Sequence, residues 1–126
     1  MAGLQGSCLC GAVRYTADGD IGAPTACHCK QCRKSSGHFW ASAWVEDSGL
    51  HVTGNVQWYQ SSDVAKRGFC PICGSALFWK HDSDPFTCFG AGTVDGDIHQ
   101  PLVKHIHTAT KGDYYEIADN APQRET

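Results

Sequence analysis

The segment that decides the fold is FCPICGS, which runs from Phe69 to Ser75. Two cysteines, Cys70 and Cys73, stand at the ends of a C-x-x-C turn, with proline after the first and glycine after the second. A tight turn of this kind brings both sulfurs to one point and directs backbone N–H groups at them, which stabilises thiolates. The pattern predicts half of a zinc site. A thioredoxin-like redox pair is the alternative, but it requires a βαβ setting that the flanking sequence does not show.

A structural zinc needs two more thiolates, and Cys8 and Cys10 are the candidates. Because they are two residues apart, both side chains would leave the same face of an extended strand. Ligand sulfurs around a tetrahedral zinc lie a little under about 4 Å apart, which is within reach of such a pair. We therefore expect one structural zinc held by Cys8, Cys10, Cys70 and Cys73, which would tie the start of the chain to its middle. The alternative is that Cys8 and Cys10 are only buried thiols.

A second segment, ACHCKQCRKSSG, places Cys27, Cys29 and Cys32 within six residues and leaves only Cys88 unassigned. Cys88 would complete a second four-thiolate structural site, or the three clustered thiolates hold zinc with one position open. Cys88 lies in DPFTCFGAG, a predicted strand, where a lone cysteine is more often a small buried hydrophobic residue than a ligand. The open site is therefore favoured, and an open position is what distinguishes a catalytic zinc from a structural one.

Three thiolates give Zn²⁺ a net negative charge and make it a weak Lewis acid, so water activation is disfavoured. Binding of an incoming substrate thiol as its thiolate is favoured instead. Lys30, Arg33 and Lys34 lie beside these ligands and would contact an anionic substrate, or they are three solvated side chains on a loop. The sequence thus predicts that the three clustered cysteines are the catalytic residues of a reaction at a substrate's sulfur.

Composition narrows the class of protein. The chain has 126 residues and 13.6 kDa, which predicts one zinc-binding domain over residues 1–126. A net charge of −3 argues against a nucleic-acid partner, and the longest apolar run, ALFW, is too short for a membrane. The first residues carry no pattern typical of an export signal, so we expect a reducing cytoplasm, where eight cysteines indicate metal binding rather than disulfides.

Short runs of β-branched and aromatic residues, separated by glycine-containing turns, predict an all-β fold of antiparallel strands with little or no helix. Residues from about Asn120 onward are expected to form a polar tail. The predicted strands are Gly11–Thr16, Phe39–Val45, Leu50–Thr53, Val56–Tyr59, Ala76–Lys80, Phe86–Ala91 and His105–Thr110.

From Gly6 to Pro122 the sequence resembles the glutathione-dependent formaldehyde-activating enzyme family. The matching elements, in the family's order, are GSCLCGAVRY, CHCKQCRKSSG, FCPICGSALFW, GTVDGD and PLVKHIHTATKGDYYEIADNAP. The resemblance implies the β-tent zinc fold, with small open sheets, and two zinc sites divided as above. It also implies a carbon–sulfur lyase that relates S-(hydroxymethyl)glutathione to glutathione and formaldehyde, with glutathione as substrate or co-substrate.

The chain departs from the family pattern in two places. KGDYY, residues 111–115, stands where such proteins usually carry tryptophan, and GTVD replaces the more usual GTLD.

Other side chains carry weaker signals. His105 and His107 alternate with Ile106, which predicts that both side chains lie on one strand face. There they would bind metal or transfer protons, or they are surface or hydrogen-bonded histidines. His28 lies between two predicted ligands and is expected to point away from the metal. The four tryptophans are expected in the core or in a pocket wall, and they are Trp40, Trp44, Trp58 and Trp79.

Three other functions are weighed against the lyase. One is a non-enzymatic zinc module that binds a protein partner, with the second cysteine cluster structural. Another is a redox enzyme of the methionine sulfoxide reductase type, which needs two C-x-x-C pairs for its metal and a separate reactive cysteine. Outside the cluster of Cys27, Cys29 and Cys32, the chain offers one clear pair, Cys70/Cys73, and a C-x-C. The third is a zinc-ribbon nucleic-acid binder, which the acidic charge balance disfavours.

Overall fold

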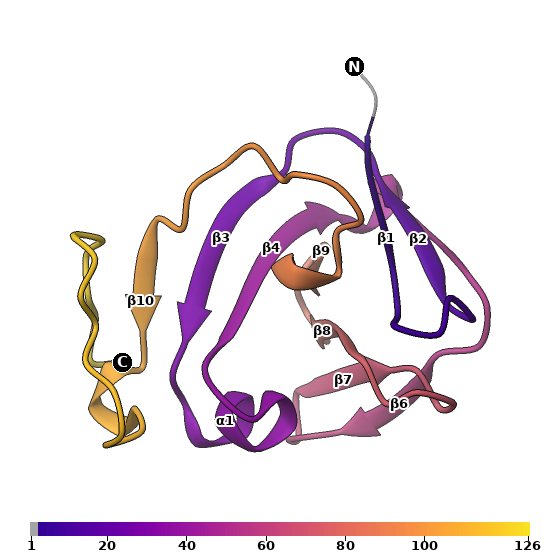
Figure 1. Cartoon of the computed structure of the whole chain (residues 1–126). Helices are drawn as coiled ribbons and strands as arrows, with labels where there is room; N and C mark the ends of the chain where they lie inside the picture. Colours follow the sequence, from indigo (N-terminus) through magenta and orange to yellow (C-terminus); the bar gives the residue numbers. More distant parts are fainter. Residues whose placement is uncertain (1–2) are drawn as a thin grey trace.

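Two β-sheets organise residues 3–126, the part of the chain that the computed structural model describes. The larger sheet curves into an arch, and the smaller sheet, which contains the N-terminal hairpin, lies across the open side of that arch (Figure 1). The strands are β1 (Leu4–Ser7), β2 (Arg14–Ala17), β3 (Gly22–Cys27), β4 (Trp40–Glu46), β5 (Leu50–Thr53), β6 (Gln57–Gln60), β7 (Ala65–Phe69), β8 (Ala76–His81), β9 (Phe86–Gly90) and β10 (Lys104–Ile106). The helical elements are α1 (Lys30–Ser36) and three single 3₁₀ turns at Asp47–Gly49, Ala91–Thr93 and Thr108–Thr110.

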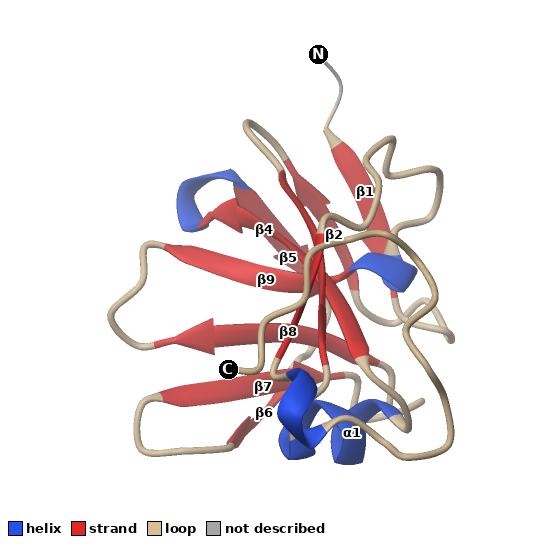
Figure 2. Cartoon of the chain, turned by 90° about the vertical axis from the view of Figure 1, so that its left-hand side faces the viewer, coloured by secondary structure: helices blue, strands red, loops and turns tan. Residues whose placement is uncertain are grey.

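Strand order confirms the predicted all-β class. The small sheet has the order β1-β2-β5, and the large sheet has the order β10-β3-β4-β9-β8-β7-β6. Figure 2 shows β4, β9, β8, β7 and β6 stacked in this order, with α1 near the β6–β7 end. One pair, β3 with β10, is parallel, whereas the sequence predicted antiparallel strands only. Most of the chain separates β3 from β10, so no tight turn dictates their relative direction.

The predicted strand at Leu50–Thr53 agrees with β5, and the other predicted strands are displaced or shortened at their ends. Three strands, β1, β3 and β7, were missed. The sequence of β3, GAPTAC, has few β-branched or aromatic residues, and its place between β4 and β10 is a tertiary effect.

Helix α1 was also missed, because seven residues are too few to show a helical period. It begins after Cys29, whose sulfur accepts a hydrogen bond from the backbone N–H of Cys32 at 3.4 Å. It ends at Gly37, which has a left-handed backbone with a φ of 88° and donates its N–H to the carbonyl of Arg33. The helix therefore starts at one predicted ligand and carries another in its first turn.

The apolar core lies between the two sheets. Tyr15 of β2 contributes a ring that meets Phe78 edge-on at 5.4 Å and Phe89 at 5.5 Å, and its hydroxyl is 2.6 Å from that of Thr93. Gly6 on the neighbouring strand leaves room for this ring, because a Cβ atom there would lie 2.1 Å from it. The buried cluster comprises Cys8, Val13, Tyr15, Ala17, Ala43, Val45, Cys70, Leu77, Phe78 and Phe89.

Two cysteine turns join the sheets at the edge of this core. Cys8 and Cys10 follow β1 of the small sheet, whereas Cys70 and Cys73 follow β7 of the large sheet. The expectation that Cys8 and Cys10 lie on an extended strand was wrong. The backbone turns there instead, because Gly11 adopts a φ of 80° and donates its N–H to the carbonyl of Cys8.

The C-terminal residues are not a free tail. The N–H of His105 donates to the carbonyl of Pro122, and the N–H of Arg124 donates back to the carbonyl of His105, each at 2.9 Å. Residues after Asn120 therefore run alongside β10, although most of their side chains are exposed, as the polar sequence predicted.

Replacement of Cys73 by serine should destabilise the fold, because Cys73 belongs to the joint between the sheets. Structural zinc binding is worth on the order of 10 kcal/mol in small zinc peptides, comparable to the stability of a whole domain. We expect Cys73→Ser to lower the free energy of unfolding by about 5 kcal/mol and to reduce soluble yield. Thermal and urea unfolding measure this effect.

The matched control is Cys88→Ala, which also removes a thiol from the large sheet but lies outside both cysteine groups. We expect this variant to lose no more than about 2 kcal/mol, the cost of one small buried group. Equal losses in the two variants would show that the four cysteines do not join the sheets.

Candidate functional site

The four sulfurs of Cys8, Cys10, Cys70 and Cys73 lie within 4.8 Å of one another. The Cys8–Cys10 and Cys10–Cys70 sulfur separations are 3.7 and 3.8 Å. Zinc–sulfur bonds of about 2.3 Å in a tetrahedron give an edge of about 3.8 Å, so this donor set fits zinc.

Hydrogen bonds to the sulfurs of Cys8 and Cys73 favour the thiolate forms of these two residues. Cys8 accepts the N–H of Val13 at 3.2 Å, and Cys70 accepts the N–H of Ile72 at 3.4 Å. The Ser75 hydroxyl, 3.2 Å from the Cys73 sulfur, is the main cause that lowers the pKa of Cys73 to about 5. The same Ser75 oxygen accepts the N–H of Leu9, which fixes one cysteine turn against the other.

Cys27, Cys29 and Cys32, which we call the cysteine triad, form a second group within 4.8 Å. Cys27 ends β3, Cys29 caps α1, and Cys32 lies buried in the helix. Among residues 3–126, no other cysteine, histidine or acidic side chain joins this group at that distance. Cys88 lies elsewhere, on β9 opposite Trp44 and Trp79, where burial raises its pKa to about 11.

Arg67 of β7 is a cation at the triad that sequence reasoning missed. Its Nη2 atom donates to the Cys32 sulfur at 3.6 Å, and its Nη1 atom donates to the Ser35 hydroxyl at 3.5 Å. The pKa of Cys32 is lowered to about 6, first by a hydrogen bond with Cys27 and also by the Arg67 charge. The pKa of Cys27 is raised, because Cys27 supplies that hydrogen bond and is itself desolvated. The triad therefore carries its negative charge next to Arg67.

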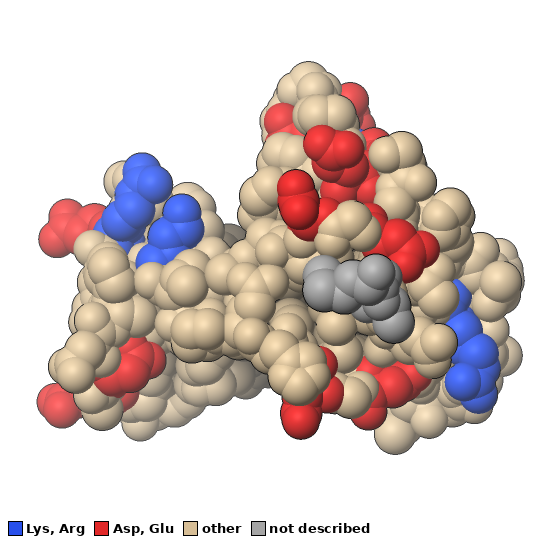
Figure 3. Space-filling view, turned by 90° about the horizontal axis from the view of Figure 1, so that it is seen from above, with Lys and Arg blue, Asp and Glu red and all other residues tan. Residues whose placement is uncertain are grey.

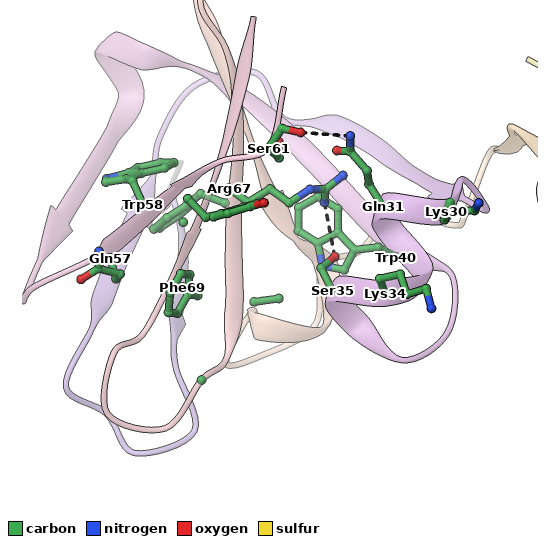
Figure 4. A pocket seen from close by; sticks show the side chains of 15 residues that line it. Lys30, Gln31, Lys34, Ser35, Trp40, Gln57, Trp58, Ser61, Arg67 and Phe69 are labelled. Carbon is green, nitrogen blue, oxygen red and sulfur yellow. Dashed lines mark hydrogen bonds between the residues drawn. The ribbon is translucent and has the colours of Figure 1, made fainter. Parts of the chain in front are cut away.

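A cavity of about 910 Å³ lies on the other side of Arg67, between α1 and strands β6 to β8. Figure 4 shows the Arg67 side chain reaching across it toward α1, with Trp40 beside the guanidinium group. The guanidinium carbon is 5.9 Å from the centre of the Trp40 ring. Within residues 3–126, the buried Nε atom of Arg67 has no hydrogen-bond partner. Arg67 thus borders both the triad and the cavity and retains an unused donor.

The three cations predicted for substrate contact do not lie together. Lys30 and Lys34 line the cavity, together with the aromatic rings of Trp40, Trp58 and others. Arg33 points elsewhere and donates to the carbonyl of Thr110 at 3.0 Å. None of the residues that line the cavity is acidic, so its electrostatic character is positive.

His28 points away from the triad, as expected, into a buried aromatic cluster. Its ring is 5.0 Å from that of Phe39 and 5.7 Å from that of Tyr115. Burial is the main cause that lowers the pKa of His28 to about 4, so the ring is neutral near pH 7. Its Nε2 atom is 2.9 Å from Nδ1 of His105, and its Nδ1 atom contacts the Tyr115 hydroxyl.

The prediction that His105 and His107 share a strand face was wrong. His105 is buried at 2% exposure, whereas His107 is exposed, because β10 ends at Ile106 and His107 turns into a left-handed conformation with a φ of 55°. The four tryptophans lie in two kinds of place. Trp40 and Trp58 line the cavity, whereas Trp44 and Trp79 lie outside it.

The surface gives no sign of a basic nucleic-acid footprint on the face seen from above. Figure 3 shows acidic side chains gathered over part of this face, whereas Lys and Arg appear toward its margins. None of the helices in residues 3–126 has the length and apolar character that a membrane span requires.

Similarity to known proteins shows the family of this chain. Residues 3–110 match the family described as glutathione-dependent formaldehyde-activating enzyme. A Halomonas elongata protein named "Putative glutathione-dependent formaldehyde-activating enzyme" is 29% identical over 96% of this chain and 85% of its own length. An uncharacterised lyase of Schizosaccharomyces pombe is 33% identical over 64% of this chain and 60% of its own length.

A solved structure shares the fold. The crystal structure of a Rhodobacter sphaeroides protein superposes with a TM-score of 0.63 at 28% identity, covering 74% of this chain and 89% of that one. The match to the family extends from the first cysteine turn through both cysteine groups and β10. The chain therefore belongs to the glutathione-dependent formaldehyde-activating enzyme family.

Proposed function

We propose that this protein is a carbon–sulfur lyase that acts on a glutathione adduct of the S-(hydroxymethyl) type, or on the adduct of a similar acidic thiol. The observation that carries the proposal is the difference between the two cysteine groups. One offers four sulfurs, whereas the triad offers three, with no further ligand atom from residues 3–126 within 4.8 Å. Membership of the family, and the lyase name of the yeast relative, support the same reaction class.

The donor sets fit zinc at both places. Cys8, Cys10, Cys70 and Cys73 would hold a structural ion, and the triad would hold the catalytic one. Zinc bound at the triad would supply a fourth position for a soft ligand, at which a substrate sulfur stays deprotonated.

Arg67 provides the charge balance that such a site needs. A substrate thiolate beside the triad adds negative charge to a group that already carries it. The Arg67 guanidinium group is in contact with Cys32, and an arginine remains protonated at any physiological pH. Arg67 therefore stabilises the thiolate that is released when the carbon–sulfur bond breaks.

The cavity suits the remainder of a substrate such as glutathione, which carries two carboxylates and one ammonium group. Lys30 and Lys34 offer charge to the carboxylates, and the Arg67 guanidinium group adds a third positive charge at the cavity wall. A volume of about 910 Å³ lies within the usual range of ligand pockets, about 300–1,000 Å³. The aromatic walls bury the apolar parts of the ligand.

The reaction itself needs few groups. In the lyase direction the carbon–sulfur bond of the adduct breaks, and the sulfur keeps the electron pair as a thiolate. The hydroxyl oxygen forms the second bond of the formaldehyde carbonyl and releases its proton to solvent. In the reverse direction the thiolate attacks the formaldehyde carbon. The residues of this chain bind the thiol part and stabilise its charge in both directions.

Metal content and thiol capture test the triad directly. We expect two zinc ions per chain, and Cys29→Ser should remain folded, retain one zinc and lose glutathione binding. Elemental analysis, thermal unfolding and calorimetry with glutathione measure these three properties. A Cys29→Ser variant that unfolds as readily as Cys73→Ser would make the triad structural, which favours the non-enzymatic zinc module. A folded variant that still binds glutathione normally would contradict capture at the triad.

Replacement of Arg67 tests the charge argument. We expect Arg67→Met to weaken glutathione binding by about 10-fold or more, because a charged hydrogen bond contributes about 1.5–3 kcal/mol. Lys66→Met is the matched control, since Lys66 lies next to Arg67 on β7 but sits over the Trp58 ring, 4.5 Å from its centre. Calorimetric titration of both variants with glutathione measures the two affinities. Equal affinity in the two variants would remove Arg67 from the substrate site.

A further inference from the structure

A continuous chain of polar contacts connects the C-terminal segment to the residue between two triad cysteines. The Tyr115 hydroxyl contacts Nδ1 of His28, and Nε2 of His28 is 2.9 Å from Nδ1 of His105. The Nε2 atom of His105 is in turn 2.9 Å from a carboxylate oxygen of Asp119. Four side chains from three segments of the sequence therefore form one network.

Both histidines in this network are buried. His28 has no exposed surface and His105 is 2% exposed, whereas the Asp119 side chain is 51% exposed at the far end. Buried polar groups of this kind stabilise a structure only when every donor and acceptor has a partner. Here each of the four ring nitrogens has one.

The carboxylate end constrains one hydrogen of this network. An ionised carboxylate only accepts, so Asp119 requires a hydrogen on Nε2 of His105. Between the two rings, one of the facing nitrogens, Nε2 of His28 or Nδ1 of His105, donates to the other. The Tyr115 hydroxyl, which both donates and accepts, can complete the network at Nδ1 of His28 in either arrangement.

The position of His28 gives this network a consequence for the triad. Cys27 and Cys29 flank His28, so the contacts that hold its ring also restrain the backbone that carries two of the three sulfurs. Backbone contacts support the same loop: the His28 N–H donates to Ile106 at 3.0 Å, and its carbonyl accepts from Thr110 at 3.2 Å. The side-chain network also connects this loop to residues 115–119, a described segment that contains no strand.

We propose that Tyr115 and Asp119 are positioning residues for the cysteine triad, acting through His28 and His105. The proposal rests on the proposed function, since it takes the triad to be the metal-holding, thiol-capturing group. Hydrogen-bond partners behind the ligands of a metal site typically contribute 10–100-fold to metal affinity. Tyr115 and Asp119 act one contact further back, on the residue between two ligands, so we expect an effect at the lower end of this range without any contact to metal or substrate.

The two adjacent tyrosines offer a matched pair of variants. Tyr115→Phe removes only the hydroxyl that contacts His28. Tyr114→Phe removes a neighbouring hydroxyl that contacts His38 instead, on a side chain that is 62% exposed. Asp119→Asn, at the exposed end, removes the charge that Nε2 of His105 faces and serves as a second variant in case Tyr115→Phe folds poorly. Zinc release to a competing chelator is the readout, with Cys29→Ser used to identify the phase that belongs to the triad.

We expect Tyr115→Phe and Asp119→Asn to weaken zinc binding at the triad by about 10-fold. The four-cysteine phase and the melting temperature should match the wild type, and Tyr114→Phe should behave as the wild type throughout. The visible absorption of the Co²⁺-substituted triad should also change in the first two variants, because it reports ligand geometry.

Three outcomes would overturn the proposal. The first is that zinc release from the triad is unchanged in both variants. The second is that Tyr114→Phe weakens zinc binding at the triad as much as they do. The third is that zinc binding at both cysteine groups and thermal stability fall in parallel. If the wild-type triad binds zinc and glutathione while the variants match it, only the positioning role fails. If the wild-type triad binds no zinc, the proposed function fails together with it.

Discussion

The contact between the two cysteine turns is the constraint on which the remaining structure depends. Cys8 and Cys10 come from the small sheet, Cys70 and Cys73 from the large one, and their sulfurs meet within 4.8 Å. The core between the sheets is modest, with Tyr15, Phe78 and Phe89 as its main rings. A metal ion at this point would join segments about sixty residues apart. Because the unfolded chain offers no preformed site, the free energy of metal binding would add to the stability of the folded state.

The same joint determines the geometry of the second cysteine group. Arg67 lies three residues before Cys70, on the strand that leads into the C-x-x-C turn. A shift of that turn would move β7, and with it the guanidinium group that contacts Cys32 at 3.6 Å. The four-cysteine group and a charged side chain of the candidate active site are therefore carried by the same strand and turn, although the two cysteine groups share no residue.

The sequence predicted much of this arrangement and missed identifiable parts of it. The triad and each half of the four-cysteine group follow from spacing, because ligands close in sequence are close in space in any fold. The pairing of the two halves across sixty residues came instead from the number of thiolates that a structural zinc needs. Arg67 could not be found in this way, since its partner Cys32 is 35 residues away and β7 itself lacks a clear strand pattern. The His105–His107 expectation failed for a similar reason, because alternation predicts a shared face only while the strand continues, and β10 ends between them.

The two sides of the triad differ in chemistry. On one side, Arg67, Lys30 and Lys34 border an aromatic cavity that is open to a ligand. On the other side, the backbone around His28 is held by hydrogen bonds that end on Asp119.

The second side also contains KGDYY, residues 111–115, the segment in which the sequence differs from the family pattern that it resembles. A phenol hydroxyl both donates and accepts a hydrogen bond. Tyr115 can therefore give its hydrogen to His28 and still accept one from water or a ligand. Tyr115 does not line the cavity, so its effect on the triad passes through His28 rather than through the cavity wall.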